Sequence, residues 1–185
     1  MFDRHLKIIQ AALEPLLASN EQILVAIDGN CTAGKTTLAN ELAKIYDCNV
    51  FHMDDFFLRP EQRTPTRYAE PGGNIDYERF QEEVLLPLQR EKSFSYRPFH
   101  CKDFTLGDPI CVTPKKLNII EGTYSQHPYF GNPYDLTIFL QADPETQYHR
   151  IIHRPVHLHA AFFDKWIPME QAYFETFDIP HKAHI

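Results

Sequence analysis

The stretch I-D-G-N-C-T-A-G-K-T-T, residues 27–37, decides the fold. It follows the apolar run I-L-V-A, residues 23–26, and precedes L-A-N-E-L-A, residues 38–43, which is typical of a helix. Gly29 and Gly34-Lys35-Thr36 satisfy the pattern G-x-x-x-x-G-K-[ST], whose glycines let the backbone turn tightly and direct its N–H groups at phosphate oxygens. A buried strand, this loop and a helix in succession predict an α/β protein with the P-loop NTPase fold.

The same loop predicts a nucleotide ligand. Lys35 supplies a positive charge for the β and γ phosphates, the Thr36 hydroxyl is a ligand for Mg²⁺, and the helix N-terminus adds partial positive charge. The alternative interpretation is a glycine-rich turn with a solvated lysine. We expect the nucleotide to be bound by Gly29, Asn30, Cys31, Thr32, Ala33, Gly34, Lys35, Thr36 and Thr37.

Strand and helix signals alternate along the rest of the chain. This alternation favours a mostly parallel sheet flanked by helices. A Pro- and Gly-rich loop is expected at 59–74, a hairpin-like insertion at 94–112, and the beginning of a further strand at 183–185. The expected strands are 23–28, 49–54, 117–121 and 136–140, and the expected helices are 3–19, 35–46, 77–89, 144–154 and 160–177. The aromatic residues of the last helix, Trp166 among them, are expected to be core.

Composition narrows the functional class. The 185 residues are expected to form a single domain, 1–185, with 43% hydrophobic and 23% charged residues. No run of about 18 apolar residues predicts a membrane span, no secretory signal is visible, and the four cysteines lack C-x-x-C spacing, which favours a cytoplasmic protein. The net charge of −7 argues against a nucleic-acid partner. We expect a small-molecule partner and no membrane partner, and a homo-oligomer stays open.

Carboxylates follow two of the expected strands. Asp54 and Asp55 close the second strand, and Glu121 closes the third. Ligands of open α/β sheets bind at the carboxyl ends of the strands, where phosphoryl transfer needs a carboxylate for the acceptor proton and oxygen ligands for Mg²⁺. Asp54 and Glu121 are candidates for both tasks. Alternatively, Asp54-Asp55 caps a turn and Glu121 is a solvated loop acid.

The order of several short motifs resembles the uridine kinase and phosphoribulokinase group of P-loop kinases. These motifs are the loop at 29–36, D-D-F-F at 54–57, G-N-I-D at 73–76, E-G at 121–122 and R-I-I-H-R at 150–154. The segment F-F-D-K-W-I-P-M-E, residues 162–170, is similar to the tail of bacterial uridine-kinase-like proteins. The resemblance spans about residues 20–180.

This resemblance implies transfer of the γ-phosphoryl group of ATP, with Mg²⁺, to a hydroxyl of a uridine- or cytidine-like nucleoside or a similar ribose-like acceptor. It implies that Asp54 is the general base and a Mg²⁺ contact, and that Asp76 holds ribose hydroxyls. It also implies that Tyr96 stacks on the base, and that Arg150 and Arg154 clamp the phosphates beside Lys35.

Two departures from the family pattern stand out. The histidine expected five residues after the tyrosine is replaced by Cys101, and the nearest histidine is His100. The lid that the resemblance implies is short: after Arg154 it reads P-V-H-L-H and lacks a basic run. Pyrimidine selectivity is therefore open, and His100 and Arg97 are retained as candidate acceptor contacts.

Two alternatives to a nucleoside kinase remain. One is an NTPase or nucleotide-binding regulator without a small acceptor, although N-K-x-D is absent and residues 103–107 are one too long for D-x-x-G. The other is a related kinase for a sugar phosphate or a pantothenate-like alcohol. That kinase predicts that Arg63, Arg67 or Arg97 faces the acceptor pocket.

Overall fold

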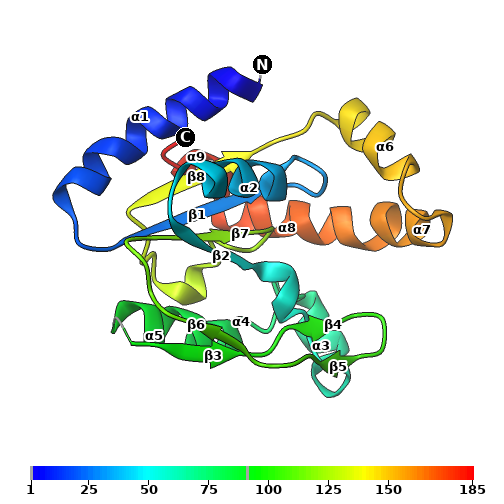
Figure 1. Ribbon diagram of the computed structural model, residues 1–185. Helices are drawn as coiled ribbons and strands as arrows, with labels where there is room; N and C mark the ends of the chain where they lie inside the picture. Colours follow the sequence, from blue (N-terminus) through cyan, green and yellow to red (C-terminus); the bar gives the residue numbers. More distant parts are fainter. Residues whose placement is uncertain (1, 91) are drawn as a thin grey trace.

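The computed structural model describes residues 2–90 and 92–185, and its centre is a parallel sheet (Figure 1). The strand order is β2-β7-β1-β8, and every neighbouring pair is parallel. This sheet confirms the predicted α/β P-loop NTPase fold. The strands are β1 (Ile23–Gly29), β2 (Cys48–His52), β7 (Leu117–Glu121) and β8 (Leu136–Leu140).

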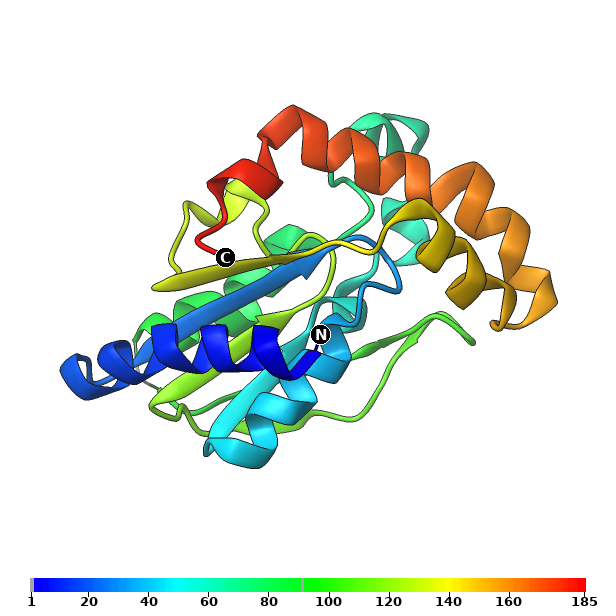
Figure 2. The same ribbon diagram turned by 90° about the horizontal axis from the view of Figure 1, so that it is seen from above.

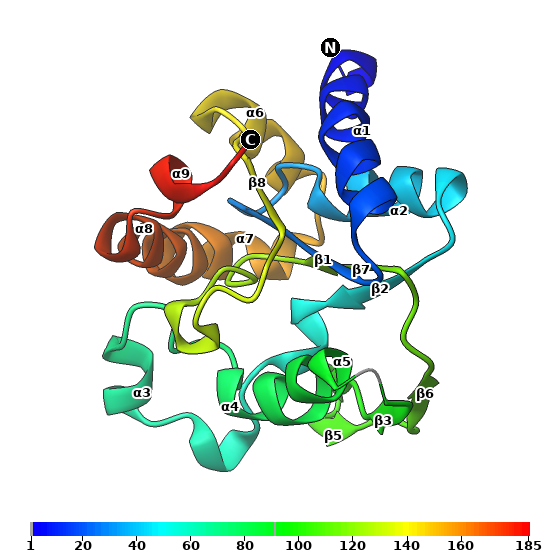
Figure 3. The same cartoon turned by 90° about the vertical axis from the view of Figure 1, so that its left-hand side faces the viewer.

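Helices cover both faces of this sheet. On one face, α1 (Phe2–Ser19) and α2 (Lys35–Ile45) lie together, and their apolar side chains pack on β1, β7 and β8 (Figure 3). On the other face, α8 (Ile167–Phe177) and a helix over residues 77–89 close a second, more aromatic core. At the carboxyl end of β1, α6 (Pro144–Ile152) and α7 (His159–Ala161) approach the loop before α2 (Figure 2).

Prolines interrupt two predicted helices without ending them. A π-turn at Gln81–Leu85 joins α4 (Tyr77–Phe80) to α5 (Leu86–Gln89), which contains Pro87. A second π-turn at Phe162–Trp166 precedes α8, which begins one residue before Pro168. Because proline donates no N–H, the wider turn before each proline lets the helix continue with a changed ladder of hydrogen bonds. The helices predicted at 77–89 and 160–177 are confirmed.

The predicted hairpin-like insertion is confirmed as two short antiparallel pairs. β3 (Phe94–Tyr96) pairs with β6 (Ile110–Val112), and β4 (Phe99–His100) pairs with β5 (Thr105–Leu106).

Three element boundaries differ from expectation. β2 ends at His52, so Asp54 and Asp55 lie on the 3₁₀ turn Met53–Phe56 and not at the end of a strand. The expected loop at 59–74 contains a 3₁₀ turn (Pro60–Gln62) and the short helix α3 (Pro65–Ala69), because Thr64 Oγ1 accepts from Arg67 N at 3.1 Å and so caps the helix. The last helix begins at His159 and passes the π-turn before α8.

The end of the chain runs beside the edge of the sheet. After α9 (Ile179–Lys182), His184 N donates to Thr137 O at 2.9 Å and Phe139 N donates to Ile185 O at 2.7 Å. This pairing on β8 is strand-like, although residues 183–185 are not assigned as a strand. The remaining elements are the 3₁₀ turns Pro128–Phe130 and Val156–Leu158. Across the described residues, no helix combines the length and apolarity needed to span a bilayer.

Gly29, at the carboxyl end of β1, is expected to tolerate no side chain. Its φ is +144°, and an added Cβ would lie 1.9 Å from Leu140 O on the neighbouring strand. We expect Gly29→Ala to lower the free energy of unfolding by about 3 kcal/mol or more, from steric overlap with backbone together with an unfavourable φ. Gly131→Ala is the matched control, because Gly131 has a φ of +67° but no atom within 4 Å of an added Cβ. That control is expected to cost only about 1–2 kcal/mol by urea denaturation, and equal losses would contradict the steric explanation.

Candidate active site

A cavity of about 1050 Å³ opens at the carboxyl ends of β1 and β7. The loop between β1 and α2 forms one side, and we call residues 29–37 the phosphate loop. The other sides are formed by residues that follow β2 and β7, by α6, and by residues between 153 and 170. The lining residues include Cys31 to Thr37 of the phosphate loop, then Asp54, Phe57, Asn74, Cys101, Glu121, Thr123, Tyr124, Arg150, Arg154, Phe162, Trp166 and Glu170.

The phosphate loop has the geometry that its motif predicts. Gly34 adopts a φ of +100° and lets α2 begin at Lys35. The Lys35 ammonium is buried and donates to Gly29 O at 2.8 Å, to Asn30 O at 2.9 Å and to Thr123 Oγ1 at 3.1 Å. The cation is therefore held inside the curve of the loop, beside the backbone N–H groups that bind phosphate in this motif.

Hydrogen bonds join the phosphate loop to the segment that follows β8. Asn30 and Ala142 exchange two hydrogen bonds of 2.9 Å, from Asn30 Nδ2 to Ala142 O and from Ala142 N to Asn30 Oδ1. Gln147 Nε2 donates to Cys31 O at 3.2 Å, and Arg150 Nη1 donates to Thr32 O at 2.6 Å. The variable positions of the loop therefore contact α6, the helix that carries Arg150 and leads to Arg154.

A buried carboxylate lies directly before the phosphate loop in the sequence. Asp28 is fully buried and accepts hydrogen bonds from Gly29 N (2.7 Å), Tyr124 N (3.2 Å), Gln126 N (3.0 Å) and Tyr173 Oη (2.9 Å). Burial raises the pKa of Asp28, and these donors oppose that rise. Sequence reasoning missed this residue, although an acid inside the apolar run before the loop was a visible signal. Asp28 joins β1, the segment after β7 and α8.

Oxygen ligands converge at the far end of the phosphate loop. Thr36 Oγ1 donates to Glu121 Oε1 at 3.1 Å, and the same oxygen lies 2.6 Å from His52 Nδ1. The hydrogen bond to Glu121 raises the pKa of His52, against the opposing effect of burial. Strand register brings these groups together, because His52 and Ile27 both pair with Glu121 across the sheet.

Asp54 lies in the same cavity. Solvent reaches its carboxylate, but the surrounding protein raises its pKa, and the negative charge of Glu121 raises it further. A hydroxyl and two carboxylates fit Mg²⁺, which prefers oxygen ligands and completes its coordination with substrate phosphates. Among the side chains of residues 4–90 and 92–185, no set of three His, Cys, Asp or Glu residues is placed to hold a metal ion.

One part of the cavity lining, which we call the aromatic wall, is uncharged and mostly aromatic. Phe57, Asn74, Tyr124, Phe162 and Trp166 contribute to it, and the rings of Phe162 and Trp166 meet edge to face at 4.7 Å. The expectation that Trp166 and Phe162 belong to the core was wrong. The π-turn Phe162–Trp166 precedes the buried part of α8, so these two rings face the cavity, whereas Tyr173 and Phe174 are core.

The structure gives Asp76 and Tyr96 buried positions. Asp76 is 1% exposed, caps α4 by accepting from Arg79 N at 3.2 Å, and lies 3.6 Å from Arg59 Nε. Tyr96 is 4% exposed and donates its hydroxyl to Asp55 Oδ2 at 3.2 Å. Neither is among the residues that line the described cavity, so their acceptor contacts stay predictions.

Arg97 and His100 lie in the hairpin insertion. Arg97 donates to Gly107 O at 2.7 Å and to Leu106 O at 2.9 Å, and His100 is an exposed residue of β4. Cys101, the neighbour of His100, does line the cavity. The acceptor roles of Arg97 and His100 also stay predictions.

A second buried acid of the site had no role in the sequence-based predictions. Glu170 on α8 is 7% exposed, and its Oε2 accepts from Cys31 N at 2.8 Å. Burial raises its pKa to about 7, against the opposing effects of the Cys31 N–H and the charge of Lys35. Glu170 ends the family-like segment 162–170, but its contact was not predictable because its partner is 139 residues away.

Fold and site together define a protein of the P-loop NTPase fold with an intact phosphate loop. No protein-family model matches the chain, and no curated protein matches it. Among solved structures, it is similar to a possible uridine kinase from Bacillus stearothermophilus, with a TM-score of 0.71 and 20% identity over 96% of this chain and 97% of the other. It is also similar to a possible fructose transport system kinase from Silicibacter sp. TM1040, with a TM-score of 0.71 and 21% identity over 95% and 94% of the two chains. These similarities show a shared fold.

Proposed function

We propose that the protein is an ATP-dependent kinase that transfers the γ-phosphoryl group to a hydroxyl of a small molecule. The observation that carries this proposal is the convergence of three parts in one cavity. These parts are the phosphate loop with Lys35, the side-chain oxygens of Thr36, Asp54 and Glu121, and the uncharged aromatic wall. A nucleotide-binding regulator needs the first two parts, whereas the third gives an acceptor a place beside the transferred group.

Each residue has a role that its position supports. The phosphate loop and Lys35 bind the phosphates, and Arg150 and Arg154 neutralise charge that spreads over the equatorial oxygens during transfer. Asp54 accepts the proton of the acceptor hydroxyl, and its raised pKa makes it a stronger base than an ordinary carboxylate. Mg²⁺ held by Thr36, Asp54 and Glu121 would supply charge neutralisation at the β and γ phosphates.

The acceptor that this cavity suits is uncharged. Arg63 donates to Leu58 O at 2.9 Å and lies over the ring of Phe104 at 4.8 Å. Arg67 is bound by both carboxylate oxygens of Glu78 at 2.7 Å. Arg97 is engaged by two carbonyls of its hairpin, as described above. Within the described residues, none of these three arginines lines the cavity, which disfavours the sugar-phosphate alternative.

We therefore propose a nucleoside or another ribose-like polyol as the acceptor. Uridine and fructose, the compounds in the names of the two structural neighbours, are both uncharged compounds with several hydroxyl groups. The aromatic wall offers ring faces for a base or for the apolar face of a sugar.

Paired acceptors test this proposal. ADP release with ATP and Mg²⁺ is to be measured with uridine, cytidine and ribose, each beside its 5′- or 5-phosphate, and with pantothenate and ribulose 5-phosphate. We expect stimulation by an uncharged acceptor and little by its phosphate, because Arg63, Arg67 and Arg97, the cations considered for an acceptor phosphate, do not line the cavity. Preferential stimulation by the phosphates would contradict the uncharged acceptor. A rate that no alcohol changes would favour an NTPase.

A further inference from the structure

Glu170 places a carboxylate on the phosphate loop itself. Its Oε2 accepts from the backbone N–H of Cys31 at 2.8 Å, and its Oε1 is 3.5 Å from Thr123 Oγ1. Thr123 Oγ1 also donates to Gly29 O at 2.9 Å and accepts from Lys35 Nζ at 3.1 Å. An acidic side chain from α8 therefore accepts from one of the N–H groups in a loop whose motif binds phosphate through such groups.

The groups around Glu170 have opposing effects on its ionisation. Lys35 stabilises the ionised form from the loop, whereas the buried Asp28 disfavours it from the end of β1. The Cys31 thiol and the Tyr124 hydroxyl face it from the loop and from the segment after β7. Burial is the largest effect, and together these influences place the pKa of Glu170 at about 7.

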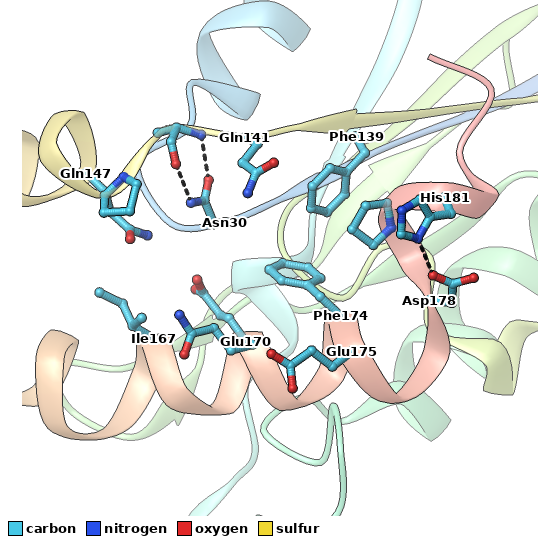
Figure 4. Close-up of a pocket in the computed structure, with 14 residues that line it drawn as sticks. Asn30, Phe139, Gln141, Gln147, Ile167, Glu170, Phe174, Glu175, Asp178 and His181 are labelled. Atoms are coloured by element: carbon cyan, nitrogen blue, oxygen red, sulfur yellow. Dashed lines mark hydrogen bonds and ion pairs between the residues drawn. The ribbon is translucent and has the colours of Figure 1, made fainter.

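Two cavities meet at this side chain. Glu170 lines the large cavity, and it also lines a smaller one of about 330 Å³ between the β8–α6 segment and the helices α8 and α9. Figure 4 shows its carboxylate reaching from α8 towards Asn30 across this smaller cavity. The Glu170 side chain therefore borders a second cavity besides the one that contains the phosphate loop.

We propose that Glu170 is a positioning residue that couples phosphate binding to proton uptake: nucleotide phosphates bind tightly to the loop only when this carboxyl is neutral. This inference rests on the proposed binding of a nucleotide to the phosphate loop. Phosphate brought beside the ionised carboxylate would meet a like charge at short range, and protonation of Glu170 removes that charge while its carbonyl oxygen still accepts from Cys31 N–H. The bound state therefore holds more protons than the free state, so nucleotide affinity falls as the pH rises through 7.

The test compares nucleotide binding across pH in matched variants. Dissociation constants for ATP with Mg²⁺, without acceptor, are to be measured from pH 6 to 8.5 for the native protein, Glu170→Gln and Glu175→Gln. The amide introduced by Glu170→Gln keeps an acceptor for Cys31 N–H but cannot titrate. Glu175 is an exposed acid on the same helix that lines only the smaller cavity, so its variant controls for a lost charge.

We expect the native protein and Glu175→Gln to lose affinity over this range, relative to Glu170→Gln, by about tenfold for each unit by which phosphate raises the pKa of Glu170. Equal pH dependence in all three proteins would overturn the inference. Absence of nucleotide binding at every pH would overturn the proposed function and this inference with it.

A measurement on the native protein alone covers the case in which Glu170→Gln does not fold. Calorimetric titration with ATP and Mg²⁺ at pH 8, in two buffers of different ionisation enthalpy, gives the number of protons taken up on binding. Phosphate, whose second pKa is about 6, is already ionised at this pH. We expect net proton uptake, and zero uptake or proton release would overturn the inference.

Discussion

Asp54→Asn is expected to lower acceptor-dependent ADP release by about 10²- to 10⁴-fold, the range over which general base catalysis contributes. The amide has nearly the same shape as the carboxylate but cannot accept the acceptor proton, and it is a weaker ligand for Mg²⁺. The loss should appear in kcat/KM for the acceptor. Because the Asp54 side chain is exposed to the cavity, the midpoint of thermal unfolding should change little.

Asp55→Asn is the matched control for this prediction. Asp55 is the next residue on the same 3₁₀ turn, but its carboxylate accepts from Tyr96 Oη at 3.2 Å and is not among the residues that line the cavity. We expect this variant to turn over acceptor at close to the native rate. Equal losses in both variants would show that the turn, and not the Asp54 carboxylate, is what activity requires.

Lys35→Met is expected to lower the rate of phosphoryl transfer by about 10²- to 10³-fold, which is the usual effect of removing one preorganised donor to developing charge. The Lys35 ammonium is fixed by three oxygen partners inside the loop, so it needs no reorganisation when phosphate binds. Methionine retains the length of the apolar stem without the charge. Nucleotide affinity should fall together with turnover, which a binding titration separates from kcat.

Lys44→Met on the same helix controls for the loss of a lysine. Lys44 is exposed at the last turn of α2 and pairs only with Glu41, at 2.7 Å. We expect native turnover in this variant, because an exposed pair of this kind contributes at most about 1 kcal/mol to stability. Full activity in Lys35→Met would contradict the role of the phosphate loop in catalysis.

The parts of this molecule that local sequence determines were predictable. β1, the phosphate loop and α2 were predicted from a continuous apolar run, a glycine-bounded loop and a helix signal. The position of Glu121 at the end of a strand was predicted because it closes the apolar run of β7. Asp54 was placed in the right cavity although its strand ends two residues earlier than expected. The carboxyl ends of parallel strands lie at the same edge of a sheet, so a two-residue error in the end of β2 still leaves Asp54 at that edge.

The parts that depend on distant contacts were not predictable. The pairing of Glu170 with Cys31 and of Tyr173 with Asp28 joins residues 139 and 145 positions apart, and neither pair has a local pattern. Tyr96 and Asp76 sit in motifs that suggested acceptor contacts, but burial depends on how the hairpin and α4 pack, which the motifs do not encode. Some aromatic residues of 162–177 face the cavity and others lie in the core, because a π-turn precedes α8 and no single residue predicts that turn.

The destination of the γ-phosphoryl group tests the proposed kinase activity most directly. ATP labelled in the γ-phosphate is to be incubated with Mg²⁺, the acceptor that stimulates ADP release most strongly, and either the native protein or Asp54→Asn. We expect one labelled acceptor phosphate for each ADP formed by the native protein, and almost none in the variant. Label found only in inorganic phosphate, in equal amount with and without the acceptor, would contradict the kinase and leave a nucleotide hydrolase in its place.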